Sequence, residues 1–176
     1  GLFSCLVADD SAYLRTLISS SLRALGVGNI KTVDDGGQGI EFLQTVRDDP
    51  MKAGMQHVDM IFSNWQMAPV DGMMLLRWVR RHKDSPNRFV PFVMVPGYAD
   101  REKVREARAM GVTEMLAKPF SVVNLGQRLL QVVERPRKFV HTAEYFGPDR
   151  RRTQREIPPG KDRRKINEKD VEGGHV

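Results

Sequence analysis

Short apolar runs alternate with amphipathic segments along the first 134 residues of the chain. Five of these runs have the length of a strand, and their mostly continuous apolar character is typical of strands buried on both faces of a parallel sheet. Glycine and proline follow several runs, as at Pro96-Gly97, and mark turns. We expect strands at residues 2–8, 29–33, 60–62, 90–95 and 113–117.

Between these runs, apolar residues recur at three- and four-residue spacing, which predicts helices with one buried face. We expect helices at residues 11–25, after the turn at 34–37, and at 72–82, 101–110 and 121–134. Residues 48–57, which include a proline and a glycine, are interpreted as a polar connection. Strands that alternate with helices predict an α/β fold with a five-stranded parallel sheet, doubly wound and covered by helices on both faces.

Polar residues stand where these strands end. Asp9 and Asp10 follow the first strand, Asn64 follows the central one, Pro96 follows the fourth and Lys118 follows the fifth. In a doubly wound sheet, ligands and chemistry sit at the carboxyl ends of the strands. The sequence therefore predicts one pocket at this edge, with Asn64 in the reactive position but without a reactive side chain.

Three spaced motifs in this order resemble the receiver domain of two-component response regulators. They are Asp9-Asp10, the stretch 58–72 with its proline and glycine, and AKPF at 117–120. The resemblance covers about residues 2–134 and implies a CheY-like domain at 1–134. It also implies that an aspartate accepting a phosphoryl group would stand at Asn64, that the acidic pair would help to hold Mg²⁺, and that a threonine or serine would stand at Pro96.

Two of these positions lack the required chemistry. Forming an acyl phosphate needs a carboxylate nucleophile, and the amide of Asn64 cannot replace it. Asn64 also removes an anionic oxygen ligand from a hard cation. Pro96 has neither a hydroxyl nor a backbone N–H to donate. We therefore predict a degenerate pocket with no aspartyl phosphorylation, no catalytic residue and no assigned metal ligand. Asp9, Asp10 and Lys118 then either form an inert network with Asn64 or hold Mg²⁺ weakly.

Composition and charge divide the chain in two. The single cysteine excludes an internal disulfide, and no apolar run reaches the length of a membrane helix, so we expect a cytoplasmic protein without membrane insertion. Residues 1–134 hold 16 Lys+Arg and 15 Asp+Glu, whereas residues 135–176 hold 12 and 7. The second segment is rich in proline and glycine and poor in apolar residues, so we expect a mostly disordered, mobile extension there.

This C-terminal segment repeats a short pattern. Gly147-Pro148-Asp149-Arg150-Arg151-Arg152 recurs, thirteen residues later, as Gly160-Lys161-Asp162-Arg163-Arg164-Lys165. Arginine can donate in a fork to guanine O6 and N7, a carboxylate can accept from guanine N1–H and N2–H, and an aromatic ring can stack on the base. A binder of polyanions alone has little use for the two aspartates. The combination favours a guanine nucleotide.

The segment resembles the Arg-rich extension of CheY-like bacterial effectors that bind cyclic di-GMP. The resemblance implies ligand contacts at Arg135, Arg137, Tyr145, Phe146, Asp149, Arg150, Arg151, Asp162, Arg163 and Arg164. It also implies a protein partner such as flagellar motor or adhesion machinery. Two alternatives stay open: a basic tail that binds nucleic acid, and a receiver adaptor that works without phosphorylation and without a nucleotide ligand.

Overall fold

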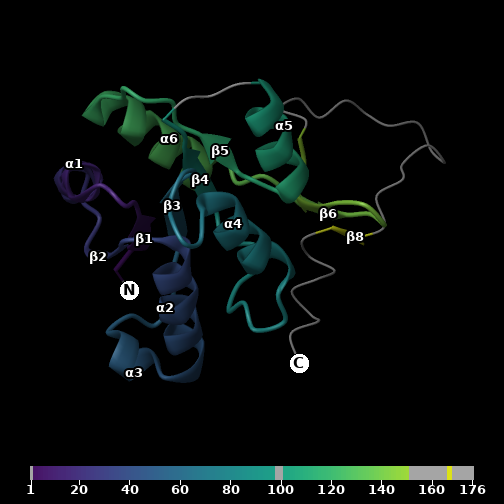
Figure 1. Ribbon diagram of the computed structural model, residues 1–176, viewed down its shortest axis with the longest axis horizontal. Helices are drawn as coiled ribbons and strands as arrows, with labels where there is room; N and C mark the ends of the chain where they lie inside the picture. Colours follow the sequence, from purple (N-terminus) through teal and green to yellow (C-terminus); the bar gives the residue numbers. More distant parts are fainter. Residues whose placement is uncertain (1, 98–100, 151–165, 168–176) are drawn as a thin grey trace.

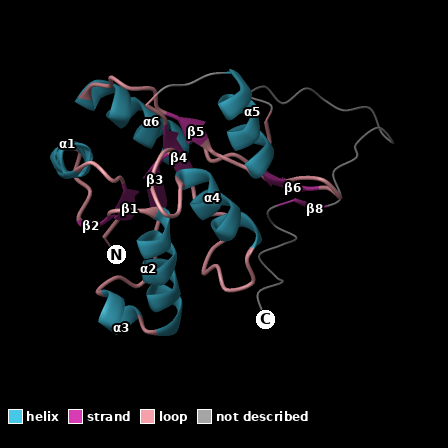
Figure 2. Ribbon diagram, viewed as in Figure 1, coloured by secondary structure: helices cyan, strands magenta, loops and turns pink. Residues whose placement is uncertain are grey.

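The structure is a computed structural model that describes residues 2–97, 101–150 and 166–167. Five parallel strands form the central sheet in the order β2-β1-β3-β4-β5, so β1 and β3 lie inside it and β5 forms one edge (Figures 1 and 2). The strands are β1 (Ser4–Ala8), β2 (Asn29–Val33), β3 (Met60–Asn64), β4 (Phe92–Val95) and β5 (Glu114–Met115). The predicted α/β fold class is confirmed.

Helices cover both faces of this sheet, and each face has its own apolar core. The first core joins the Leu6, Ile61 and Met94 face of the strands to α2, α4 and α5. The second joins the Val7 and Phe62 face to α1 and α6. The helices are α1 (Ala12–Ala24), α2 (Gly36–Asp48), α3 (Pro50–Ala53), α4 (Gly72–Arg81), α5 (Arg101–Met110) and α6 (Val122–Glu134). Within the part of the chain that the structure describes, none of these helices is both long and apolar enough to cross a membrane.

The strands β1, β3 and β4 differ from their predicted bounds by two residues at one end, and two other elements differ more clearly. The predicted polar connection at 48–57 contains the short helix α3, which Asp49 caps by accepting from the Lys52 N–H and which ends at Gly54 in the left-handed region, φ 68°. Proline at the first helical position suits such a start, because its missing N–H would be unpaired there anyway. The fifth strand is shorter than predicted, since only Glu114 and Met115 pair with β4.

The C-terminal segment also differs, because its first part is ordered against the body. Residues 135–150, here called the arm, form a hairpin of β6 (Phe139–His141) and β7 (Phe146–Pro148), and β6 also pairs with β8 (Ile166–Asn167). The arm is therefore ordered, which differs from the mobile extension that the sequence analysis expected in this part of the segment. The sequence analysis interpreted Tyr145 and Phe146 as ligand contacts, whereas Phe146 packs with Phe139 in a small core.

That small core explains the order of the arm. Phe139 and Phe146 are both buried, and their ring centroids lie 5.1 and 5.5 Å from that of Phe89, in the loop before β4. Gly147 of the arm and Gly111 at the end of α5 lie so close that a side chain on Gly147 would meet the Gly111 Cα at 2.7 Å. Such a close backbone approach needs glycine on both sides.

Candidate functional site

The predicted pocket lies at the carboxyl edge of the sheet, and Asn64 is at its centre. Asn64 is the last residue of β3, and its amide nitrogen donates to the Gln66 carbonyl (3.0 Å) and to Asp10 Oδ1 (3.4 Å). Its amide oxygen accepts from Lys118 Nζ at 3.3 Å. The predicted hydrogen bond between Asn64 and Lys118 is therefore present. Gly72 lets α4 begin against the end of β3, because any side chain there would collide with the Asn64 carbonyl.

Asp9 lies beneath this network and is fully buried. Its Oδ1 accepts from the Ser11 N–H at 2.9 Å, and its Oδ2 lies 3.8 Å from Lys118 Nζ. Burial raises the pKa of the Asp9 carboxyl, and the Ser11 N–H and Lys118 oppose that rise only in part. Asp9 is therefore held by one backbone donor and one nearby ammonium group.

The residues of this pocket do not fit the Mg²⁺ that the receiver resemblance implies. Mg²⁺ prefers carboxylate and other oxygen ligands, but the Asn64 oxygen already accepts from Lys118, and the same ammonium lies beside Asp9. In the described ranges, no group of three or more His, Cys, Asp or Glu residues is placed to hold a metal ion. The ammonium group of Lys118 takes up the position between the oxygens, and we assign no metal to them.

Pro96 directly follows β4 and lies near a second, larger site. Here β5, α5, α6 and the arm enclose a groove of about 890 Å³. Pro96 lines this groove at its end toward the pocket, since its neighbour Val95 pairs with Asn64 across the sheet. The two sites are thus adjacent at the carboxyl edge of β4.

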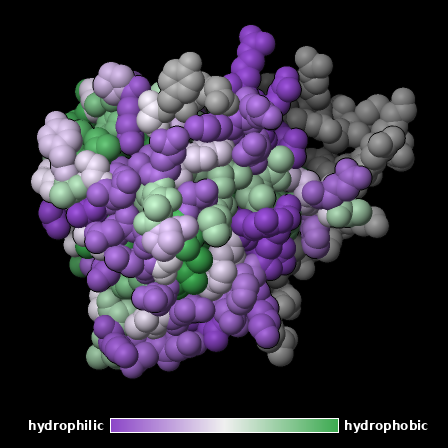
Figure 3. Space-filling model, in the orientation of Figure 1, coloured by the Kyte–Doolittle hydropathy of each residue, from purple (hydrophilic) through white to green (hydrophobic). Residues whose placement is uncertain are grey.

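Arginine dominates the walls of this groove, here called the arginine groove. Of the residues that the structure describes, five arginines line it, whereas Glu114 is its single acidic residue. Two arginines come from α5, one from α6 and two from the arm, namely Arg105, Arg108, Arg128, Arg137 and Arg150. Figure 3 shows strongly hydrophilic side chains over α5, at the top of the view.

The arm places three of the predicted ligand residues along the groove. Arg137 donates to Glu114 Oε1 at 2.9 Å. Tyr145 donates its hydroxyl to the Pro148 carbonyl at 2.7 Å, and the Arg150 guanidinium lies 4.2 Å from the centre of the Tyr145 ring. Burial raises the pKa of the Tyr145 hydroxyl, opposed by Arg150. These contacts present an aromatic face and a stacked guanidinium together.

Arg80 of α4 ties the arm to the body. It is fully buried, and it donates to the carbonyls of Gly111 (2.9 Å), Arg88 (2.8 Å) and Val90 (2.7 Å). Its guanidinium also lies 5.0 Å from the centre of the Phe139 ring in β6. Burial lowers the pKa of Arg80 to about 9. Arg80 thus fixes the loop before β4, the turn before β5 and the arm in one place.

These geometries agree with comparisons to known proteins. A model of the response regulator receiver domain matches residues 5–130. The chain belongs to the response regulator receiver family. The match ends within α6, so the arm lies outside it.

Individual receivers show the same extent of similarity. Chemotaxis protein CheY-3 of Vibrio cholerae is 30% identical over 130 residues, which cover 74% of this chain and 91% of that protein. Chemotaxis protein CheY of Pseudomonas aeruginosa is also 30% identical, over 74% of this chain and 95% of its own. The solved structure of the chemotaxis response regulator CheY4 of Vibrio cholerae has a TM-score of 0.63 and 27% identity, and covers 75% of this chain and 99% of that one.

Outside the receiver match, one predicted ligand contact does not fit the structure. Phe146 is 6% exposed, and the Arg88 guanidinium lies 3.6 Å from its ring centre. A ring that is buried to this extent has no free face for a base, so Phe146 positions the arm instead. A buried apolar partner such as Phe89 gave no sequence signal, because the two residues lie far apart in the chain.

The other predicted contacts have different environments. Arg135 is exposed at the C-terminal end of α6. The Asp149 N–H donates to the Lys138 carbonyl at 2.6 Å, which closes the arm hairpin. Four predicted contacts lie outside the described residues, namely Arg151, Asp162, Arg163 and Arg164.

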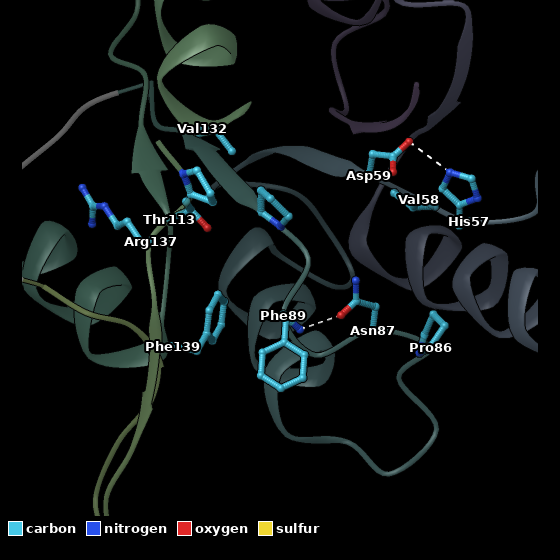
Figure 4. Close-up of a pocket in the computed structure, with 12 residues that line it drawn as sticks. His57, Val58, Asp59, Pro86, Asn87, Phe89, Thr113, Val132, Arg137 and Phe139 are labelled. Atoms are coloured by element: carbon cyan, nitrogen blue, oxygen red, sulfur yellow. Dashed lines mark hydrogen bonds and ion pairs between the residues drawn. The ribbon is translucent and has the colours of Figure 1, made fainter. Parts of the chain in front are cut away.

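A further pocket of about 560 Å³ lies on the other side of the arm (Figure 4). Figure 4 shows Phe89 and Phe139 next to each other at one end, and His57 paired with Asp59 at the other, 3.3 Å apart. Prolines, valines and these aromatic rings line most of it, and Arg137 is the single arginine that the described residues place there. Its chemistry suits an apolar group far better than an anion, so the arginine groove is the better candidate for a nucleotide.

Proposed function

We propose that this receiver is a non-catalytic signalling adaptor that binds cyclic di-GMP through its arginine-rich C-terminal segment. In this proposal, aspartyl phosphorylation plays no part. The ligand instead orders residues 135–176 further and changes how the receiver body meets a protein partner.

The pocket at the carboxyl edge supports the first part of the proposal. The Asn64 side chain has no nucleophilic oxygen, and both ends of its amide are engaged by Gln66, Asp10 and Lys118. Pro96 offers no donor to a phosphoryl oxygen. The network leaves the lysine hydrogen-bonded without any phosphate, so the pocket is stable as it stands.

The observation that carries the second part is the pairing of Tyr145 and Arg150 beside the arginine groove. The Arg150 guanidinium lies 4.2 Å from the centre of the Tyr145 ring, so an aromatic ring and an arginine fork lie side by side. An aromatic ring stacks on a base for about 1–3 kcal/mol, and an arginine fork matches the O6 and N7 acceptors of guanine. Arg137 lines the same groove and adds positive charge near the phosphates of such a ligand.

Calorimetric titration of the full chain with cyclic di-GMP, with GTP as control, tests the ligand. We expect saturable binding of cyclic di-GMP and much weaker binding of GTP. Binding should be lost in Arg150→Ala/Arg163→Ala, which removes one arginine from each repeat. Unchanged affinity in that variant, or no binding by the wild type, would refute the ligand assignment.

Incubation with acetyl phosphate tests the absence of phosphorylation. The wild type should gain no phosphoryl group, while Asn64→Asp/Pro96→Thr restores both missing functional groups and serves as the positive control. A hydroxylamine-labile phosphoprotein formed by the wild-type chain would overturn this part of the proposal.

The positive charge of residues 135–176 also favours a nucleic acid as a rival ligand. That function predicts affinity for single-stranded oligonucleotides that falls steeply with salt and little preference for one nucleotide. Titrations of the full chain with cyclic di-GMP and with an oligonucleotide, each in 50 and 200 mM salt, therefore separate the two functions. A receiver adaptor without a nucleotide ligand predicts no binding in either series.

The protein partner is proposed from the relatives alone. The curated relatives are named chemotaxis proteins, which favours a partner in motility, such as the flagellar motor; adhesion machinery is the other candidate. Capture of a motor component by the full chain that depends on cyclic di-GMP would support this assignment, and capture that ignores the ligand would oppose it.

A further inference from the structure

The receiver body contributes its own arginines to the arginine groove. Arg105 and Arg108 lie three residues apart on α5, so they share one face of the helix. Both are exposed, and both line the groove opposite the arm. Among the described residues, neither guanidinium forms an ion pair or a side-chain hydrogen bond. Two cations therefore line the same space without an ion-pair partner in that part of the chain.

The one carboxylate that the described part of the chain places in the groove is already engaged. Glu114 is buried and accepts from Arg137 at 2.9 Å, and Arg128 of α6 lies 3.9 Å from its other oxygen. Among the described residues, five arginines and one glutamate leave an excess of four positive charges around about 890 Å³. Such an excess in a hollow attracts and concentrates anions.

Size and shape favour a compact dianion over an extended acidic chain. Sites for small ligands typically have volumes of about 300–1,000 Å³, which includes this groove. Helix α5, helix α6 and the arm enclose it on three sides. The Tyr145–Arg150 pair on the arm wall suits a purine base, whereas Arg105 and Arg108 have fork geometry suited to phosphate oxygens.

We infer that the arginine groove is a composite site, in which Arg105 and Arg108 of the receiver body bind the phosphodiester groups of the ligand whose bases the arm binds. This inference rests on the proposed function, because it concerns the same dinucleotide. It adds that the arm is not sufficient: the ligand bridges arm and body, and so locks the arm onto the α5–β5–α6 side of the receiver.

The test is a calorimetric titration of the full chain with cyclic di-GMP, comparing Arg105→Ala/Arg108→Ala with a matched control. The control is Arg77→Ala/Arg101→Ala, which removes two exposed helix arginines that do not line the groove. We expect the first variant to bind at least ten times more weakly, which corresponds to about 1.4 kcal/mol, and the control to stay within twofold of the wild type. All four side chains are exposed, so both variants should melt as the wild type does.

The outcomes separate the two proposals. Wild-type binding with an unchanged affinity in Arg105→Ala/Arg108→Ala would overturn the composite site and leave the arm as the ligand site. No binding by the wild type would overturn both. Lysine keeps the positive charge but not the planar fork of arginine. An affinity of Arg105→Lys/Arg108→Lys between that of Arg105→Ala/Arg108→Ala and that of the wild type would therefore support direct phosphate contacts. Displacement of bound ligand by an equimolar glutamate-rich peptide would reassign the groove to a protein and overturn the inference.

Discussion

Replacing Arg80 with methionine should destabilise the protein and release the arm. Arg80 donates four hydrogen bonds inside the protein, to the carbonyls of Gly111, Arg88 and Val90 at 2.7–2.9 Å and to Thr113 Oγ1 at 3.3 Å. Methionine has a similar length but no donor, so these acceptors would lose their partner. A buried acceptor left unpaired costs about 1–3 kcal/mol.

Two effects set the net magnitude. Burying the guanidinium costs desolvation free energy, and the same burial lowers the pKa of Arg80 to about 9. Its removal therefore returns part of that free energy. The lost hydrogen bonds and the lost contact with the Phe139 ring, 5.0 Å away, act in the opposite direction. We expect a net loss of about 3 kcal/mol in the free energy of unfolding. For a chain of this size, that loss lowers Tm by about 6–12 °C.

Urea denaturation and thermal melting of Arg80→Met and Arg81→Met measure this effect. Arg81 is the next residue on α4 and is exposed, so its replacement should change stability by less than about 0.5 kcal/mol. Hydrogen exchange should also speed up in the arm of Arg80→Met. Equal stability of the two variants would refute the argument that Arg80 fixes three segments of the chain. Rescue by Arg80→Lys would also contradict it, because a single ammonium cannot reach acceptors spread around the fork.

Three further predictions test other parts of the structure. Phe146→Ala should raise hydrogen exchange at residues 139–148 while β1 and β3 stay protected, because the ring is buried against Arg88 outside the main cores; uniform acceleration across the sheet would contradict this. The pKa of Asp9 is raised in the folded protein, so the ionised carboxylate destabilises the fold, and stability grows as pH falls through the folded pKa toward the unfolded one. Asparagine carries no charge, so Asp9→Asn should stabilise the protein at pH 7. Urea melts of both proteins from pH 8 to 4 measure this, and a difference that does not shrink on acidification would refute it. Cys5 should resist alkylation in the native protein at pH 8, because burial raises the pKa of its thiol to about 12; rapid modification without unfolding would show that β1 is more accessible than the structure indicates.

Sequence patterns were sufficient for the receiver body because its order follows from local signals. Continuous apolar runs identified the buried strands, and apolar residues at three- and four-residue spacing identified the helices; Ser11 and Ser121 cap two of these helices in the structure by accepting from the backbone N–H three residues later. The receiver motifs also brought Asn64 and Lys118 together. In this body, the local sequence pattern, the helix starts and the packing of the core all agree with the same fold, as expected for a sequence that specifies one structure.

The arm could not be predicted in the same way because its order depends on distant contacts. Phe146 packs on Arg88 and Phe89, which precede it by more than fifty residues, and no local pattern announces that pairing. The arginine groove was missed for a similar reason. Arg105 and Arg108 have the pattern of an ordinary solvated helix face, and only the docked arm gives them a wall to face.

The position of the arginine groove suggests how a ligand could replace phosphate as the signal. Asn64 pairs with Val95 across β3 and β4, and the next residue, Pro96, already lines the groove. The groove then runs along β5 between α5 and α6. A ligand there would act directly on that side of the fold. It would need no relay from the carboxyl-edge pocket, so Asn64 and Lys118 could remain in their hydrogen-bonded arrangement throughout. If the proposal holds, binding of cyclic di-GMP should leave the NMR signal of the Asn64 side-chain amide in place while the signals of β5 and the arm shift. A large shift of the Asn64 amide signal would instead show that the carboxyl-edge pocket takes part in the response to the ligand.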